Sequence, residues 1–198
     1  MVRQKILVLF RRVSRRTFVS LILGIVTMSP KQSWGRNLPE MLNLKEAVRI
    51  PLKSVTQEWQ QQYFEAWVTS DEIVAKGVSD KPSFDRLFFG ALLRLPGKGQ
   101  KTGSGPDDFF AYCTLCSHEA CEVILVEDTR PVRLEEGIHP EHPLVVCPCH
   151  FSVFDPQEHG RVLNGPALRG LYRFKFHQDR DHIVITHIES AAMALFQS

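Results

Sequence analysis

The sequence predicts an all-β domain of about 160 residues behind a basic N-terminal leader. Many short segments are rich in β-branched or aromatic residues and are bounded by glycine, proline or aspartate, which is typical of strands. The alternation is clearest where Tyr172, Phe174 and Phe176 are separated by charged residues, as in a half-buried strand. The length after the leader suffices for one domain with its own core.

In chain order, the expected strands cover residues 47–51, 63–68, 72–76, 87–95, 108–112, 122–126, 144–146, 171–176 and 182–188. A further short strand is expected to follow residue 151 and to run into a turn at Pro156. Residues 37–43 and 189–197 are each expected to form a short helix.

Two short boxes carry the residues that decide the chemistry. The first reads Cys-Ser-His-Glu-Ala-Cys at 116–121, and the second reads Cys-Pro-Cys-His-Phe-Ser at 147–152. Thiolate and imidazole together select soft or borderline metals. The boxes therefore indicate a metal centre, and they argue against a hydrolase or a nucleic-acid binder. The four candidate ligands are Cys116, His118, Cys147 and His150.

The paired boxes resemble those of the Rieske iron–sulfur protein family, in the subgroup with two extra cysteines. This resemblance implies a [2Fe–2S] cluster in which two cysteines hold one iron and two histidines hold the other. It also implies a disulfide between Cys121 and Cys149, which would tie the two ligand loops together. The implied fold is a β-sandwich with an inserted cluster-binding subdomain at about residues 113–171.

A zinc site is the main alternative that the residues leave open. Cys113 and Cys116 have CxxC spacing, and Cys147 with His150 could complete a Cys3His set. That set leaves His118 and both extra cysteines unexplained. In the iron–sulfur interpretation Cys113 is instead expected to be a buried, small side chain at the end of a strand.

Residues after the second box bear on the reduction potential. In respiratory relatives a serine at the position of Ser152 donates to a cluster sulfide, and a tyrosine commonly occupies the position of Phe154. Hydrogen bonds to the sulfurs stabilise the reduced cluster, so the missing hydroxyl predicts a lower potential here. The Gly165-Pro166 turn resembles the proline loop that covers the cluster in this family.

The leader resembles a twin-arginine export signal, with Ser-Arg-Arg-Thr-Phe-Val at 14–19 and an apolar run over 18–26. Up to Arg36 the chain has eight Lys or Arg and no acidic residue, while the remainder has sixteen basic and twenty-two acidic residues. Residues 1–36 are therefore expected to be a signal or membrane anchor, and residues 37–198 the Rieske domain. The apolar run is shorter than the roughly 17–25 residues of a membrane span, which favours cleavage. The lack of an Ala-x-Ala site favours retention as an anchor at the periplasmic face of the inner membrane.

Electron transfer is the expected function, with no separate substrate site. The leading hypothesis is the iron–sulfur subunit of a quinol-oxidising cytochrome bc-type complex, with cytochrome b or c-type partners. The alternative is the small relay subunit of a periplasmic molybdenum oxidase resembling arsenite oxidase, with a molybdopterin large subunit. A zinc-stabilised structural module is the third reading. Two neutral imidazoles give the cluster less negative charge than four thiolates, so its potential should lie within about −150 to +300 mV.

Overall fold

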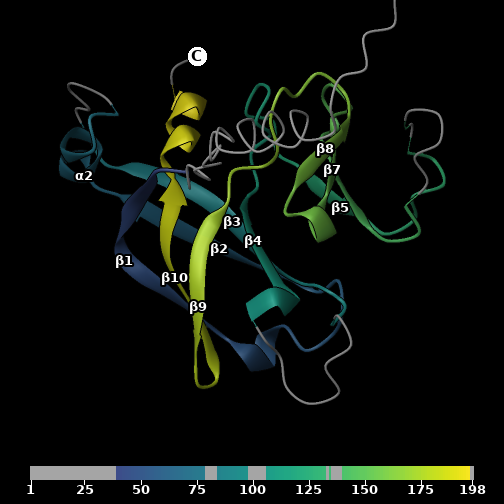
Figure 1. Cartoon of the computed structure of the whole chain (residues 1–198), viewed down its shortest axis with the longest axis horizontal. Helices are drawn as coiled ribbons and strands as arrows, with labels where there is room; N and C mark the ends of the chain where they lie inside the picture. The colour runs from purple at the N-terminus through teal and green to yellow at the C-terminus, as the bar shows by residue number, and fades with distance from the viewer. Residues whose placement is uncertain (1–38, 79–83, 98–105, 133, 135–139, 197–198) are drawn as a thin grey trace, which may run out of the picture. The chain divides into compact units, whose positions relative to one another are not determined.

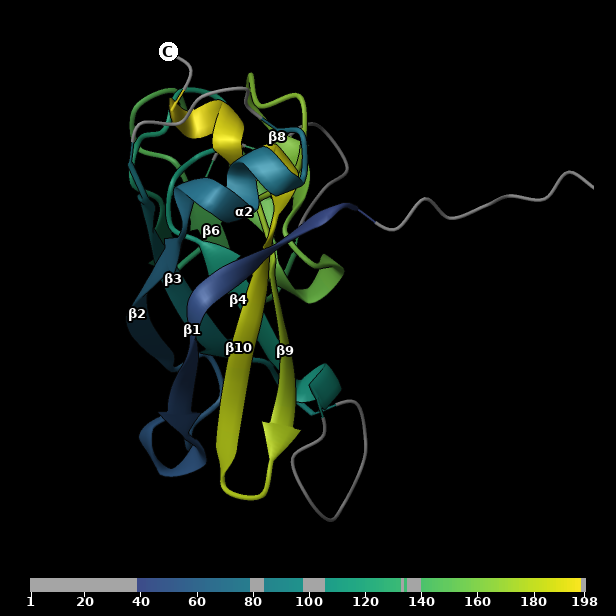
Figure 2. The same cartoon turned by 90° about the vertical axis from the view of Figure 1, so that its left-hand side faces the viewer.

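Two three-stranded antiparallel sheets form a sandwich around a shared apolar core. The first sheet has the spatial order β1 (Met41–Pro51), β10 (His182–Glu189), β9 (Phe174–Asp179). The second has the order β2 (Gln61–Val68), β3 (Arg86–Arg94), β4 (Phe109–Cys113). Figures 1 and 2 show the first sheet in front of the second. The computed structural model describes residues 39–78, 84–97, 106–132, 134 and 140–196.

A third, four-stranded sheet lies between β4 and β9 in sequence. It has the order β5 (Ile124–Val126), β6 (Leu144–Val146), β7 (Val153–Asp155), β8 (Arg161–Asn164), with each neighbouring pair antiparallel. Its labelled strands form a separate group on the right of Figure 1. All four fall within residues 113–171, so the all-β sandwich with an inserted subdomain is confirmed.

Strands β3 and β4 form the wall between the two halves, because both faces are buried from Gly90 to Leu93 on β3 and along the whole of β4. Phe88 and Leu92 on β3 point into the sandwich core, together with Ala111 on β4. The alternate residues point the other way, into a second apolar cluster that also contains Cys116 and Cys147. These alternate residues are Ala91, Leu93, Phe110 and Tyr112. Because side chains alternate along a strand, one hairpin can serve as the floor of the metal-site subdomain and as a layer of the sandwich.

Two expected elements are wrong. Residues 72–76 are not a strand, since α2 (Ser70–Ala75) is a short helix. Thr69 caps it by accepting a hydrogen bond from the Glu72 N–H at 3.2 Å, and this Thr-x-x-Glu spacing is a helix-start signal. The β-branched pair Ile73 and Val74 favoured a strand, but the cap decides the local structure.

The expected helix over residues 37–43 is also contradicted, because β1 begins at Met41 and its side chains alternate between core and solvent from Leu42 to Lys45. Residues 37 and 38 lie outside the described part of the chain. The C-terminal helix is present as the 3₁₀ helix η4 (Ser190–Phe196). Three shorter 3₁₀ turns are η1 (Leu52–Ser54), η2 (Pro106–Asp108) and η3 (Pro156–Glu158).

The predicted signal or anchor over 1–36 falls outside the described residues and stays a prediction. Within the part of the chain that the structure describes, no helix is both long and apolar enough to span a bilayer.

Candidate metal centre

The two Cys/His boxes fold into matching turns. In each, the N–H of the first residue donates to the carbonyl of the sixth, and the N–H of the fifth donates to the carbonyl of the first. These distances are 2.7 and 3.0 Å in the loop 116–121, and 2.8 and 3.0 Å in the loop 147–152. The fifth residues, Ala120 and Phe151, both have left-handed backbones, with φ of 55° and 59°. Each loop therefore presents its first cysteine from the same backbone geometry.

The two first cysteines are buried side by side. Cys116 is 0 % exposed and Cys147 is 1 % exposed, and both belong to the apolar cluster under the third sheet. Burial raises the pKa of the Cys116 thiol, and the neighbouring Cys147 sulfur raises it further, while the backbone N–H groups of His118 and Glu119 lower it. A metal ion that binds these sulfurs must displace their protons, so metal binding here releases protons.

The two histidines lie on the outer side of the same loops. The rings of His118 and His150 are nearly perpendicular, at 88°, with centroids 5.0 Å apart. Both side chains reach solvent, with 28 % and 44 % of their surfaces exposed. The site therefore has two sulfurs on the inside and two imidazoles at the surface.

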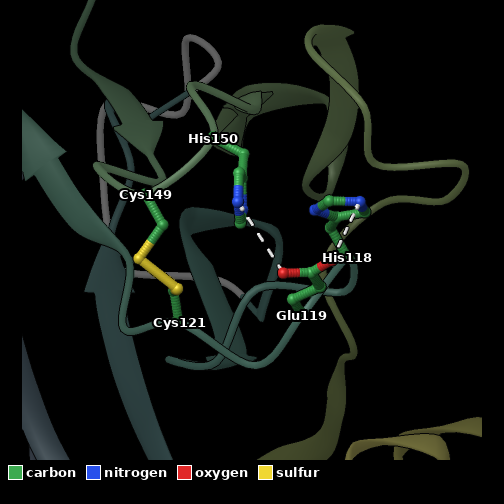
Figure 3. The surroundings of a disulfide bond; sticks show 5 residues. All are labelled: His118, Glu119, Cys121, Cys149 and His150. Carbon is green, nitrogen blue, oxygen red and sulfur yellow. Dashed lines mark ion pairs between the residues drawn. A yellow bond between two sulfur atoms is a disulfide. The ribbon is translucent and has the colours of Figure 1, made fainter.

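A disulfide joins the two loops. Cys121 of the first box is bonded to Cys149 of the second, and the sulfurs of this pair lie close to that of Cys147. Figure 3 shows the bond on one side of the site, with the two rings and Glu119 on the other. Because both sulfurs are used in the bond, neither is available as a metal ligand.

The structure argues against a zinc site that includes Cys113. Cys113 is 0 % exposed at the end of β4, where its N–H donates to the Tyr172 carbonyl at 2.8 Å. Its side chain belongs to the sandwich core, and not to the cluster that contains Cys116 and Cys147. Burial raises the pKa of the Cys113 thiol to about 11. The expectation of a buried, small side chain at a strand end is confirmed.

The proline loop fastens to both boxes. The Ala167 N–H donates to Ser152 Oγ at 3.2 Å, and Ser117 Oγ donates to the Arg169 carbonyl at 2.8 Å. A side chain at Gly165 would have no room, since its Cβ would lie 2.5 Å from Ser152 Cα. Pro166, the next residue, is exposed at the surface of the turn. The loop thus lies directly over the second box.

Replacing Gly165 by alanine is expected to displace this loop. The backbone φ of +94° is unfavourable for any residue with a Cβ, and the new methyl would also collide with backbone atoms of Phe151 and Ser152. Strain of this kind costs about 1–3 kcal/mol before the collision is counted. Gly77→Ala is the matched control, because Gly77 also has a positive φ but has open space around its Cβ position. Urea unfolding should show a clearly larger loss of unfolding free energy for Gly165→Ala than for Gly77→Ala. Equal losses would contradict the close approach of Gly165 to the backbone of Phe151 and Ser152.

A buried carboxylate fastens the proline loop to the sandwich. Glu189 is 1 % exposed and is paired with both Arg169 and Arg173, the second at 2.6 Å. The Arg169 guanidinium also lies over the ring of Tyr172, 4.3 Å from its centroid. No local sequence signal marks this group, because its members come together only where β10 packs against the segment that follows the proline loop.

Ser152 and Phe154 both lie inside the subdomain. Each is 0 % exposed, and Phe154 shares its apolar cluster with Cys116 and Cys147. Since Ser152 Oγ accepts from Ala167, its own hydrogen remains available to donate. Both side chains are therefore placed where they can affect the energy of a charge held by the two cysteines.

Phe154→Tyr is expected to raise the reduction potential. The new hydroxyl would enter the cluster of side chains that contains both cysteines, where a donor stabilises the reduced, more negative state. A hydrogen bond worth about 1.4 kcal/mol more to the reduced state corresponds to about 59 mV for a one-electron couple. Phe174→Tyr, in the sandwich core, is the control and should leave the potential unchanged. Protein-film voltammetry that showed no rise, or a fall, would refute the assignment.

The donors fit an iron–sulfur cluster of asymmetric ligation. Cys116 and Cys147 would hold one iron, and His118 and His150 would hold the other. Buried sulfurs and exposed nitrogens match the chemistry of that ligand set, in which imidazoles replace two thiolates on one metal only. The ligand assignment itself stays a prediction, which iron analysis of the variants below would test.

Comparisons with known proteins agree with this chemistry. Residues 98–175 match the model of the Rieske [2Fe-2S] domain. The chain is 31 % identical over 78 residues to the cytochrome bc1 complex Rieske iron-sulfur subunit of Corynebacterium glutamicum, covering 39 % of this chain and 16 % of that protein. It is 35 % identical over 63 residues to a candidate Rieske subunit of a respiratory nitrate reductase from Haloferax mediterranei, covering 32 % of this chain and 22 % of that protein. The chain thus spans less than a quarter of the length of these relatives.

A similar solved structure is the soluble domain of Rieske protein II from Sulfolobus acidocaldarius. It aligns at a TM-score of 0.43 and 18 % identity, covering 72 % of this chain and 78 % of that one. The family match includes both boxes and the proline loop, which are the parts of the chain that build the site. Residues 98–175 of this chain are a Rieske [2Fe–2S] domain.

Proposed function

We propose that this protein transfers single electrons as the iron–sulfur subunit of a quinol-oxidising, cytochrome bc-type complex. One observation carries the proposal: the two matched loops hold a pair of buried thiols behind a pair of exposed imidazoles. When bound, the cluster supplies a one-electron couple of relatively high potential.

The surrounding residues suit this role. Cys116 and Cys147 would hold their metal away from water, and the disulfide would limit how far the loops separate when the charge changes. His118 and His150 reach the surface, where an electron would enter or leave. A quinol hydroxyl could hydrogen-bond to an exposed ring nitrogen, and a cytochrome b or c-type subunit would be the redox partner. The bc1 name of several relatives supports this choice of complex.

The second candidate is the small relay subunit of a periplasmic molybdenum oxidase. Phe154 in place of tyrosine favours this candidate, since the sequence of the second box and the residues after it resembles that of the arsenite-oxidase group. The relative named for a respiratory nitrate reductase also supports a Rieske subunit outside bc complexes.

The proposed location is the periplasmic face of the bacterial inner membrane, reached through the twin-arginine signal, with the leader cleaved or kept as an anchor. The Cys121–Cys149 bond supports an oxidising compartment, where such bonds persist.

The test is electron paramagnetic resonance of the dithionite-reduced full chain, with iron, zinc and acid-labile sulfide measured on the same sample. The expected result is a Rieske-type signal with two irons and two sulfides per chain. A colourless protein that contains zinc and no iron would overturn the proposal. Co-purification with a cytochrome b, or with a molybdopterin subunit, distinguishes the two candidates.

A further inference from the structure

Glu119 lies between the two exposed imidazoles. Its Oε1 is 3.9 Å from His118 Nε2, and its Oε2 is 3.7 Å from His150 Nε2. Figure 3 shows the carboxylate directed toward both rings, with one oxygen to each.

The position of this carboxylate is set by the first loop. Glu119 precedes Ala120, whose left-handed backbone and N–H···O bond to Cys116 close the turn. The backbone N–H of Glu119 also points toward the Cys116 sulfur. The loop therefore holds the carboxylate beside the histidines, although 61 % of the side chain is exposed.

The acidic side chains near the site differ in whether they pair with the two histidines. Among the described residues, it is the one acidic side chain that pairs with either His118 or His150. Other acidic residues that follow the boxes have different partners: Asp128 is paired with Arg130, Asp155 with His142, and Glu158 with Arg161. Among the described residues, Glu119 is thus the carboxylate that lies against both histidines.

We propose that Glu119 sets the reduction potential of this centre, lowering it by placing a fixed negative charge against both histidines. Reduction adds one electron to the cluster and makes it more negative, and a neighbouring carboxylate opposes that change. The inference rests on the proposed electron-transfer function, because it needs a bound cluster. It adds a second potential-lowering feature to the missing hydroxyl at Phe154, from the opposite side of the site.

The expected size is modest because the carboxylate is exposed. Pairs of exposed charges usually change an equilibrium by less than about tenfold, which is below about 59 mV for a one-electron couple. Salt should screen the effect, since the Debye length falls from about 30 Å at 0.01 M to about 3 Å at 1 M ionic strength.

The test compares midpoint potentials of cluster-loaded full-chain variants by protein-film voltammetry. Glu119→Gln keeps the shape of the side chain and removes its charge. The reduction potential of this variant should therefore rise, by less than about 59 mV. Glu119→Asp should stay near the parent protein, and Glu119→Lys should rise further. Glu122→Gln is the matched control, since Glu122 is an exposed carboxylate near the same loop that pairs with neither histidine. The gap between the parent protein and Glu119→Gln should shrink as salt is raised.

An unchanged or lower potential in both Glu119→Gln and Glu119→Lys, with the paramagnetic signal intact, overturns this inference and leaves the electron-transfer function standing. An equal rise in Glu122→Gln also overturns it, because the effect would not be local. If Glu119→Gln does not take up iron, the salt dependence of the parent protein and the Lys variant decide the matter. A parent protein without the paramagnetic signal refutes the proposed function instead.

Discussion

Cys147→Ser is expected to abolish binding of the iron–sulfur cluster while the sandwich remains folded. A serine hydroxyl does not ionise as a thiol does, and soft iron–sulfur chemistry selects thiolate ligands. Cys147 is 1 % exposed and lies beside Cys116, so no other free thiol can take its place. Iron and acid-labile sulfide per chain should fall close to zero, and the paramagnetic signal should disappear.

Cys113→Ser is the matched control, because it makes the same chemical change at an equally buried cysteine in the other apolar core. This variant should keep its iron and its signal. A Cys147→Ser protein that retained the full signal would refute the ligand assignment. A folded Cys113→Ser protein that lost its metal would show that Cys113 is a ligand and would favour the zinc-type set.

The chemistry of the site could be predicted from sequence because all of its candidate ligands lie in two short segments. The ligand types and the spacing of 116–121 and 147–152 are local features, and their pairing has few alternative explanations. The turn geometry was not predictable in the same way. Its left-handed positions hold Ala120 and Phe151, where a sequence-based argument would look for glycine.

The contacts that position the site depend on packing between distant segments. Arg169 and Glu189 are twenty residues apart, and nothing in the sequence around either residue indicates that they form an ion pair. Glu119 could be recognised as an exposed acid, but its place between two rings depends on the second loop folding against the first. The strand predicted at 72–76 is wrong for a different reason, since the β-branched composition of Ile73 and Val74 indicates a strand while the Thr69 cap starts a helix.

Loss of the disulfide is expected to destabilise the cluster-free protein strongly. Cys121 and Cys149 are 28 residues apart. Cross-linking a loop of this size lowers the entropy of the unfolded chain, which stabilises the folded protein by about 3.5 kcal/mol at 25 °C. The double variant Cys121→Ser/Cys149→Ser should therefore unfold at a clearly lower urea concentration than the parent protein, once both have been stripped of metal. The slope of the transition should rise in the double variant, because an unfolded chain without the cross-link exposes more surface to urea.

The same double variant should lose less stability when the cluster is bound. A cluster held by Cys116 and His118 on one loop, and by Cys147 and His150 on the other, would itself cross-link the two loops. The disulfide would then add little further constraint, so the two stabilising effects are not additive. The cost should appear instead in the rate of cluster loss, because Cys149 lies directly between two ligands of the second loop. Bleaching of the visible absorbance under a chelator should be faster in the double variant than in Cys113→Ser, which removes a thiol that is not part of the bridge. Equal bleaching rates, together with equal urea midpoints for the metal-free proteins, would mean that the matched turns alone hold the ligands in place.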